Sequence, residues 1–478
     1  MKASAVSFLL LAAGLALPLA ARAQNELSNF SATGRGGVVN TFASDYQAIG
    51  INPANLGRVL NFRVAFTVGE VGAGINSQSL TRTTFNHLLR NGSQRIGPAE
   101  KATLVDQLTG DNVLNLNVDT NLLGLAITLP SGLGGIAFSS RQRVASHLAL
   151  NRNIADIIVN GQNADVIRQY YPVLNTSGNP TPTNPNAPFI STVLDGTSIQ
   201  AAATNEFNVA YGVEVIDKTG FHLSVGAGYR YIQGIGIADI RASGGTLTAY
   251  TSLSPVFNVN YGALASSSNF NLEQGTGLHP VGYGHGFDLG LAAEVGKIVR
   301  LGASATDLGS MTWTGNVLGV SDQKLQQVAS TGVQTYDVLG EIARQFDVSN
   351  RNLFTYETAR ERTAALPAKL RLGGGVRISK LFETGLDVTL PLNKVAGNLT
   401  APFVGLGLDV RPLSWLKLSS GFSGGAGYGK SLPLGLTFIT PLWEGGLSTR
   451  DVVGLFSESS PYSSVAFGVL RFKLGGSE

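Results

Sequence analysis

The chain has 478 residues, of which 60 are glycine, none is cysteine and 14% are charged, and its formal net charge is only +3 at neutral pH. The lack of cysteine excludes a disulfide framework, thiolate chemistry and lipid attachment to an N-terminal cysteine. The near balance of basic and acidic side chains leaves no strong field for nucleic acid. Ordinary globular chains have about 25% charged residues and about 7% glycine. The composition therefore favours a class other than the ordinary globular proteins.

Residues 1–23 have the pattern of a secretory signal peptide. Lys2 supplies the positive start, AVSFLLLAAGLALPLA is the apolar stretch, and ARA at 21–23 is a small-x-small cleavage site. After residue 23, no apolar stretch approaches the roughly 18 residues that a membrane helix needs. A secreted, glycine-rich chain of this kind is typical of a transmembrane β-barrel.

Residues 24–57 precede the first segment with a strand pattern. They are small, glycine-rich and weakly apolar, and they are too polar to form a strand that faces lipid. Pro53 fixes its own φ and holds Asn52 in an extended conformation. We expect this segment to lie in the periplasm or to fold back into the barrel.

Several later segments alternate with a period of two residues. Apolar side chains occupy one phase of 205–215, 221–231, 286–296 and 369–379, and the other phase is mostly Gly and Ala with single charges. This pattern predicts a crowded lumen of small residues and an apolar surface that faces lipid. The charges on the inward phase form either a selectivity network or an ordinary solvated lining: Arg230, Asp288, Glu294, Lys369, Arg371, Arg377, Asp409 and Arg411.

The connections between these segments are of two lengths. Short links such as Asp217–Gly220 contrast with long ones near 80–112, 150–204 and 309–367. Short periplasmic turns and long outer loops are typical of outer-membrane barrels. We therefore predict an all-β chain whose residues 58–478 form an antiparallel transmembrane barrel of about 14 strands. Apolar spacing at 99–108 and 334–346 predicts helical insertions in the long loops.

Two motifs of enzyme chemistry occur close together. GGAGYGKS at 424–431 has the spacing of a phosphate-binding loop, and GFSGG at 421–425 has that of a nucleophile elbow. Both need a strand, a tight turn and then a helix, whereas LPLGLTFIT, which follows, alternates as a strand. We therefore expect a hairpin loop between barrel strands, no catalytic residue and no cofactor.

The histidine and tryptophan residues suggest no further site. His87, His147, His222, His279 and His285 have no metal-ligand spacing, so no metal is expected, and His285 is expected in a loop or in the lumen. Trp313, Trp415 and Trp443 fall near predicted strand ends, where interfacial aromatic girdles belong.

The N-terminal segment contains GRGG at 34–37, ASD at 43–45 and NPANL at 52–56. These strings resemble the N-terminal segment of the long-chain fatty acid transporter (FadL-like) family, with Asn55 where that family usually has Gly. The resemblance implies a 14-stranded outer-membrane barrel whose N-terminal residues form a hatch that plugs the lumen; many members carry hydrophobic compounds. It places residues 24–57 as the hatch. The matching residues are Gly34, Gly36, Asp45, Asn52, Pro53, Ala54 and Leu56.

The downstream chain is similar to a related group of Gram-negative outer-membrane barrels of unknown function. The stretches at 287–313 and 366–388 carry this resemblance. We therefore expect a barrel in the outer membrane of a Gram-negative bacterium that passes a hydrophobic small molecule and contacts outer-membrane lipid. The alternatives are an accessory barrel of a secretion or surface-attachment system, with a protein partner at the long loops, and an outer-membrane enzyme.

Overall fold

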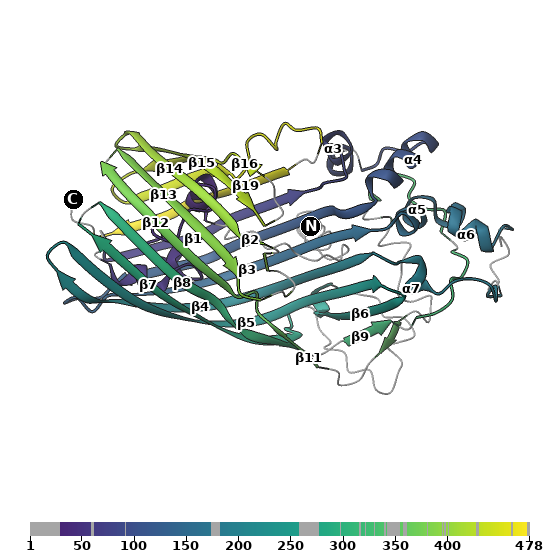
Figure 1. Cartoon of the computed structure of the whole chain (residues 1–478), viewed down its shortest axis with the longest axis horizontal. Coiled ribbons are helices and arrows are strands. Elements are labelled where there is room, and N and C mark those ends of the chain that lie inside the picture. The colour runs from purple at the N-terminus through teal and green to yellow at the C-terminus, as the bar shows by residue number, and fades with distance from the viewer. Residues whose placement is uncertain are drawn as a thin grey trace.

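A closed ring of antiparallel strands forms the body of the protein (Figure 1). The computed structural model describes residues 29–58, 62–90, 92–173, 182–257, 277–296, 298–314, 317–320, 322–328, 330–338, 341, 354–356, 361–379, 381–393, 395, 398–399, 401–426, 430–459 and 462–475. Fourteen strands complete the ring, and pairing of the last strand with the first closes it. The predicted 14-stranded barrel is therefore confirmed.

The ring strands follow chain order and are long enough, when tilted, to cross a bilayer in most cases. They are β1 (Val64–Asn76), β2 (Gly110–Thr128), β3 (Gly135–Leu150), β4 (Ser198–Lys218), β5 (Phe221–Ser243), β7 (Gly282–Val295), β8 (Val299–Trp313), β12 (Lys369–Ser379), β13 (Phe382–Pro391), β14 (Phe403–Leu413), β15 (Leu416–Gly425), β17 (Leu434–Ile439), β18 (Trp443–Thr449) and β19 (Tyr462–Leu474).

The two rims of the barrel differ. One rim carries short turns, such as the one between β4 and β5, and there β1 begins and β19 ends. The other rim carries long connections that contain short strands and helices. These strands are β6 (Thr246–Leu253), β9 (Val317–Val320), β10 (Phe354–Tyr356), β11 (Arg362–Ala365) and β16 (Lys430–Ser431). We call the two ends the short-turn rim and the long-loop rim.

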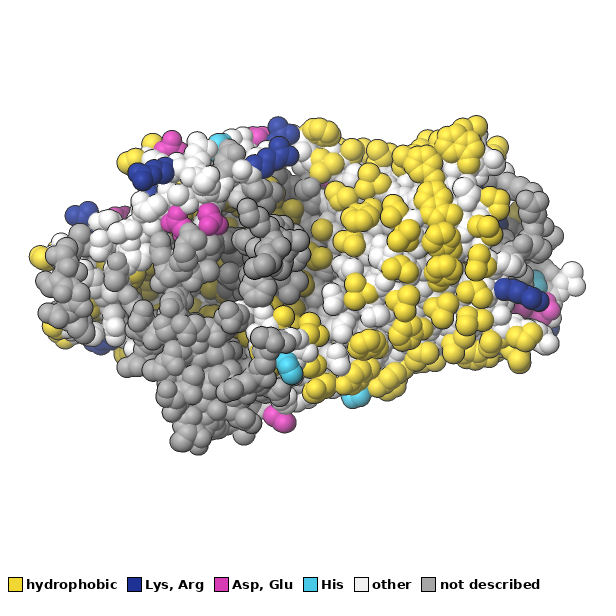
Figure 2. All heavy atoms as spheres, turned by 180° about the vertical axis from the view of Figure 1, so that it is seen from behind, with side chains coloured by type: hydrophobic (Ala, Val, Ile, Leu, Met, Phe, Trp, Pro, Cys, Tyr) yellow, Lys and Arg dark blue, Asp and Glu magenta, His cyan; other side chains and the backbone are white. Residues whose placement is uncertain are grey.

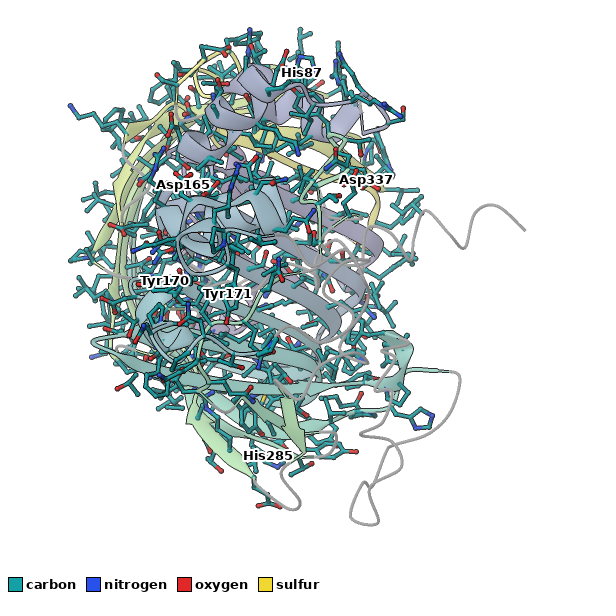
Figure 3. The ribbon with its side chains drawn as sticks, turned by 90° about the vertical axis from the view of Figure 1, so that its right-hand side faces the viewer. His87, Asp165, Tyr170, Tyr171, His285 and Asp337 are labelled. Carbon is teal, nitrogen blue, oxygen red and sulfur yellow. The ribbon has the colours of Figure 1, made fainter. Side chains whose placement is uncertain are left out.

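The helices of the long connections pack into a folded cap at the long-loop rim, which Figure 3 shows from its end. They are α3 (Arg82–Arg90), α4 (Pro98–Gln107), α5 (Arg152–Asn160), η3 (Gly161–Asn163), α6 (Asp165–Tyr170), α7 (Ile190–Val193) and η4 (Pro255–Phe257). One apolar core includes Phe85, Leu104 and Val159, and a second includes Ile167 and Tyr171. The helix predicted over 99–108 is confirmed as α4, whereas most of 334–346 lies outside the described residues.

Large apolar side chains form a belt on the barrel face that Figure 2 shows. Each ring strand exposes at least one large apolar side chain, for example Leu289 of β7, Leu406 of β14 and Leu447 of β18. On β4, Val209 is 40% exposed whereas Asn208 is 2% exposed. A surface of this kind is stable in lipid rather than in water. Within the described ranges, none of the helices has the length and apolar character needed to cross a membrane.

Two side chains face in directions that their sequence context did not predict. Trp313 is buried inside the ring and does not form part of an outer girdle. The reason is a bulge at Asp307, where the register of β7 and β8 shifts by one residue and the inward phase changes. His285 faces outward rather than into a loop or the lumen, because it shares the phase of exposed Tyr283 and Phe287.

The structure describes the whole of one enzyme-like motif and only part of the other. Residues 421–425, the GFSGG string, lie in β15, and β17 begins at Leu434, so this string is part of a strand with no helix after it. A nucleophile elbow needs a strand-to-helix turn, which this stretch does not form. Residues 427–429 of the GGAGYGKS string lie outside the described residues.

Candidate functional site

Residues 29–58, which we call the inner segment, form three short helical turns, each begun by an Asn or Asp side chain. Asn29 begins α2 (Phe30–Gly34), Asp45 begins η1 (Tyr46–Ala48), and Asn52 begins η2 (Pro53–Gly57). The side chain of each accepts a backbone N–H from two or three residues further on, at 3.0–3.1 Å. Pro53 occupies the first position of η2, where a missing N–H costs nothing.

The inner segment lies inside the ring, against glycines that point into the lumen. A Cβ atom at Gly226 would lie 2.4 Å from the backbone nitrogen of Ala54, and one at Gly290 would lie 2.1 Å from Asn52 Oδ1. On twelve of the ring strands there is a glycine at which an added Cβ atom would contact the inner segment, or a side chain that itself touches the segment. These glycines are Gly124, Gly135, Gly212, Gly226, Gly290, Gly302, Gly373, Gly385, Gly405, Gly435, Gly446 and Gly468.

We call these twelve glycines the glycine girdle. Their contact with the inner segment explains why the inward-facing residues of the strands are small. Gly135, Gly212, Gly226 and Gly290 lie side by side on four successive strands. Without side chains there, the backbone of the segment approaches the wall closely. The space that a wall of ordinary side chains would fill is occupied by the inner segment.

The residues that the resemblance assigns to a hatch all lie at this contact. Gly34 packs on Gly435, and Gly36, at φ +68°, lies against Ser423 and Pro433. The Asn52 side chain donates to the carbonyl oxygen of Leu291 at 3.0 Å, and Pro53, Ala54 and Leu56 are buried against the wall. Asn55, which replaces the family's Gly, donates to the carbonyl oxygen of Asn40 at 2.8 Å and so joins two parts of the segment.

Charged and polar contacts hold the inner segment to the wall at several points. Tyr46 Oη donates to Glu70 Oε1 at 2.8 Å, and Asp45 forms an ion pair with Arg471. Further contacts join Arg35 with Asp409 at 3.1 Å, Arg58 with Glu294, and the backbone N–H groups of Val39 and Asn40 with one oxygen of Asp387 at 2.6 and 2.7 Å.

Tyr46 is a deeply buried titratable group of the inner segment. Its ring packs on Gly124, and the side chain is 1% exposed. Burial raises the pKa of Tyr46 well above its ordinary value, and the nearby Glu70 carboxylate raises it further. The phenol therefore remains a hydrogen-bond donor throughout the physiological pH range.

A loop-side cavity of about 420 Å³ lies between the inner segment and the long-loop rim. One part of its lining is apolar and belongs to a buried cluster with Ile232, Met311, Trp313 and Leu366. The other part carries charged side chains of β2–β5, β8, β11 and β12. These are Asp119, Arg141, Arg143, Glu206, Arg230, Asp239, Arg241, Asp307, Arg362 and Lys369.

Arg230 joins the floor of the loop-side cavity to the inner segment. Its guanidinium lies 2.5 Å from Asp307, 3.3 Å from Glu206 and 3.4 Å from Asp288. A Cβ atom at Gly50 of the segment would lie 2.9 Å from the same guanidinium. Asp307 reaches this position only through its left-handed backbone at φ +60°. A non-glycine residue in that region stores strain, which is common at functional sites.

A turn-side cavity of about 290 Å³ lies between the inner segment and the short-turn rim. It differs from the loop-side cavity in having a predominantly charged lining. Glu294, Arg377, Asp409 and Arg411 belong to this lining. Of the other predicted lumen charges, Lys369 lines the loop-side cavity, Arg230 and Asp288 form the floor cluster, and Arg371 is buried in the lumen.

Several residues of the site were missed at the level of sequence, among them Arg35, Arg58, Glu70 and Arg471. Arg471 and Lys473 are charged residues of the same phase in the last strand, β19, and this was a signal that could have found Arg471. Glu70 offered no such signal, because strict alternation would put it on the same face as exposed Val68. Gly69 between them has φ +78°, and the inward phase changes there.

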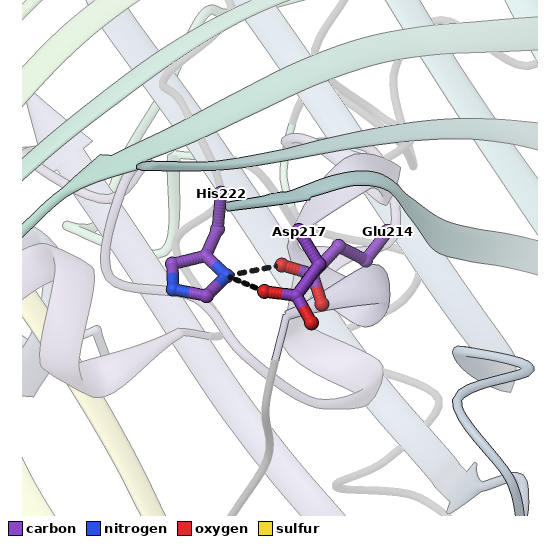
Figure 4. Close-up of side chains that lie close together, drawn as sticks. All are labelled: Glu214, Asp217 and His222. Carbon is purple, nitrogen blue, oxygen red and sulfur yellow. Dashed lines mark hydrogen bonds and ion pairs between the residues drawn. The ribbon is translucent and has the colours of Figure 1, made fainter. Parts of the chain in front are cut away.

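A carboxylate–imidazole cluster lies near the short-turn rim (Figure 4). His222 Nδ1 is 2.6 Å from Glu214 Oε1 and 3.2 Å from Asp217 Oδ1. Among the described residues, this is the one group of three metal-ligating side chains whose ligand atoms lie within 4.8 Å of one another. It lies on the β4–β5 hairpin and lines neither cavity.

A family of unknown function (DUF5723) matches residues 53–442. A search of curated protein sequences found no match. Three solved structures are similar to this chain. The Ralstonia pickettii toluene transporter TbuX has 15% identity and a TM-score of 0.45, with 93% of this chain and 98% of that chain covered.

The other two solved structures have similar identities, TM-scores and coverages. The Pseudomonas putida toluene transporter TodX has 10% identity and a TM-score of 0.44, with 93% and 97% covered. A Pseudomonas aeruginosa FadL homologue has 13% identity and a TM-score of 0.43, with 93% and 98% covered.

Proposed function

This chain belongs to the DUF5723 family of unknown function, and we propose that it is an outer-membrane channel for hydrophobic small molecules in which the inner segment is the hatch. The observation that carries the proposal is the position of the segment. It lies between a partly apolar cavity on the long-loop side and a charged cavity on the short-turn side. In the outer membrane, long loops face outward and short turns face the periplasm.

The loop-side cavity suits the capture of an apolar molecule. Its volume of about 420 Å³ falls within the roughly 300–1,000 Å³ of ligand pockets. Met311, Trp313 and Leu366 supply apolar contact area, and the bulge at Asp307 is what turns Trp313 toward the lumen. A flexible thioether beside an aromatic ring adapts to ligands of different shape.

Passage through the barrel requires the inner segment to move. Several of its contacts with the wall are polar: the charged pairs Arg35–Asp409, Arg58–Glu294 and Asp45–Arg471, and the hydrogen bond from Tyr46 to Glu70. Water that enters with an opening lumen can replace such contacts at low net cost, because exchange of hydrogen bonds with water is nearly balanced. Where the wall consists of glycines, it offers no side chains that interlock with the segment.

The proposal is tested by mass spectrometry of protein purified from native membrane and by the permeability of a deletion variant. We expect an apolar compound to co-purify with the barrel. We expect removal of residues 45–57 to leave the heat-modifiable mobility of a folded barrel and to raise the uptake of apolar dyes into proteoliposomes. An empty lumen together with unchanged uptake would contradict the channel, and loss of assembly alone would make the segment merely structural.

The folded cap at the long-loop rim favours a second candidate, an accessory barrel that presents a surface to a protein partner. The cap has apolar cores of its own and exposes Val173 at 81% and Phe189 at 49%. Recovery of a stoichiometric protein partner with a ligand-free lumen would support this role against the channel. Neither candidate assigns catalysis to the chain.

A further inference from the structure

The turn-side cavity contains more positive than negative charge. Eight basic side chains line it against four carboxylates. Two of the basic groups, Arg35 and Arg58, belong to the inner segment. The other six belong to the wall and are Arg300, Arg377, Arg411, Lys417, Arg471 and Lys473.

The carboxylates of the cavity are shared between the basic groups. Glu294 accepts from Arg58 at 2.9 Å and from Arg300 at 3.1 Å. Asp409 lies 3.1 Å from Arg35 and 3.7 Å from Lys417. Since Glu294 and Asp409 each already pair with two cations, neither carboxylate offsets the excess positive charge of the cavity.

Glu444 and Glu383 extend the same pattern. Glu444 lies 3.1 Å from Arg471 and 2.9 Å from Lys473, and Glu383 pairs with Arg377. Asp45, which lies behind the cavity wall and is fully buried, reduces the excess by one charge through Arg471. A net excess of about three positive charges in a space with low-dielectric walls raises the local concentration of anions.

Arg411 is the basic group best placed to receive an anion. It is part of β14 near the short-turn rim, it is half-buried, and its guanidinium makes no hydrogen bond or ion pair with any residue that the structure describes. Its positive charge acts on Asp409 and on Lys417, which places these groups in one electrostatic cluster. Guanidinium groups bind oxyanions in a bidentate manner that a lysine does not match.

We propose that the turn-side cavity is a binding site for a small multivalent oxyanion of the phosphate type. A bound oxyanion offsets the excess positive charge, occupies the donors of Arg411 and lies among arginines of both the wall and the inner segment. Since Arg35 and Arg58 belong to the segment, the bound anion also links the segment to the barrel. This site does not depend on the transported molecule, because a barrel that passes no apolar compound would still bind phosphate.

Isothermal titration of the purified full-length barrel with inorganic phosphate tests the site, with chloride at equal ionic strength as the control for screening. We expect saturable binding of one phosphate per barrel and no saturable binding of chloride. The variant Arg411→Gln should weaken phosphate binding at least tenfold, and Arg411→Gln with Arg300→Gln should abolish it. Arg152→Gln removes an exposed arginine on the cap and should leave phosphate binding unchanged.

A second measurement uses the unaltered protein and so does not depend on the folding of a variant. Phosphate should protect Arg411 from modification by phenylglyoxal, as measured by peptide mass spectrometry, and should not protect Arg152. Absence of saturable phosphate binding, or binding that Arg411→Gln leaves unchanged together with no protection of Arg411, would overturn the site. Apolar-dye uptake is a separate readout, so failure of the channel and failure of the anion site are distinguishable.

Discussion

The phenol of Tyr46 donates a 2.8 Å hydrogen bond to the carboxylate of Glu70, and this bond joins the inner segment to the first strand of the barrel. Both side chains are 1% exposed, so neither can exchange its partner for water while the segment is in place. Gln47 donates to the same oxygen at 3.2 Å. The strength with which the segment is held therefore depends on a small number of buried polar contacts.

Replacement of Tyr46 by Phe should weaken the hold on the segment. It removes one donor from a buried acceptor, and a loss of this kind costs about 1–3 kcal/mol. Limited proteolysis should show faster cleavage within residues 29–58, while heat-modifiable mobility of the barrel is kept. Tyr211→Phe is the matched control, because Tyr211 is exposed and donates to the carbonyl oxygen of Leu133 at 2.8 Å. Equal cleavage in the two variants would contradict the role of the Tyr46–Glu70 contact.

Alkaline pH should release the inner segment. The pKa of Tyr46 in the folded protein is raised above its ordinary value of 10.0, so the phenol is protonated in both folded and released states below about pH 10. Above that pH the released state ionises first, and the stability of the docked segment falls as pH rises toward the folded pKa. Ultraviolet titration of the 13 tyrosines should show a late-ionising step in wild type that is smaller by one tyrosine in Tyr46→Phe.

Addition of one methyl group to the glycine girdle should displace η2. Gly226→Ala places a Cβ atom 2.4 Å from the backbone of Ala54 and of Pro53, which cannot both move without loss of contact with the wall. Overpacking of this kind costs about 1–3 kcal/mol. Conductance of single barrels in planar bilayers should rise. Gly374→Ala, whose Cβ atom would meet only Leu301 at 3.8 Å, should behave as wild type, and a rise in both variants would refute the girdle's role.

Asp45→Asn should open the lumen without loss of the local helical turn. Asn accepts the Gln47 N–H as well as Asp does, so η1 keeps its first hydrogen bond. The substitution removes one of the two carboxylates that pair with buried Arg471, and the cost has an upper bound of about 3–5 kcal/mol, that of losing a sole partner in a buried pair. Uptake of apolar dye should increase severalfold. Asp106→Asn breaks the exposed pair with Arg152 and should leave uptake unchanged.

Much of the architecture could be predicted from sequence because period-two alternation is a local property. Phe207, Val209 and Tyr211 face outward, and Asn208 and Ala210 face inward, as the alternation predicts. The prediction failed for Trp313 because one extra residue at the Asp307 bulge changes every side-chain direction after it. Such a bulge has no reliable sequence signal in a chain with so many glycines.

For the eight predicted lumen charges, neighbouring residues in the sequence predict the direction of the side chain but not its partners. Their inward direction followed from alternation, but which of them line the loop-side cavity, the turn-side cavity or neither did not. Glu294 meets Arg58 across 236 positions of sequence, and Asp409 meets Arg35 across 374. Neither of these two pairs could be assigned from sequence, because only closure of the ring around the inner segment brings their residues together.

By itself, the sequence determined that this protein is a barrel with an apolar outside and a lumen of small residues, since side-chain direction in a strand is set by neighbouring residues. It also singled out the NPANL string at 52–56. Only the tertiary structure decided that NPANL forms a turn against Gly226 and Gly290, that Tyr46 meets Glu70, and that the segment lies between two cavities of different chemistry. These contacts join residues that are distant in the chain, and closure of the ring brings them together.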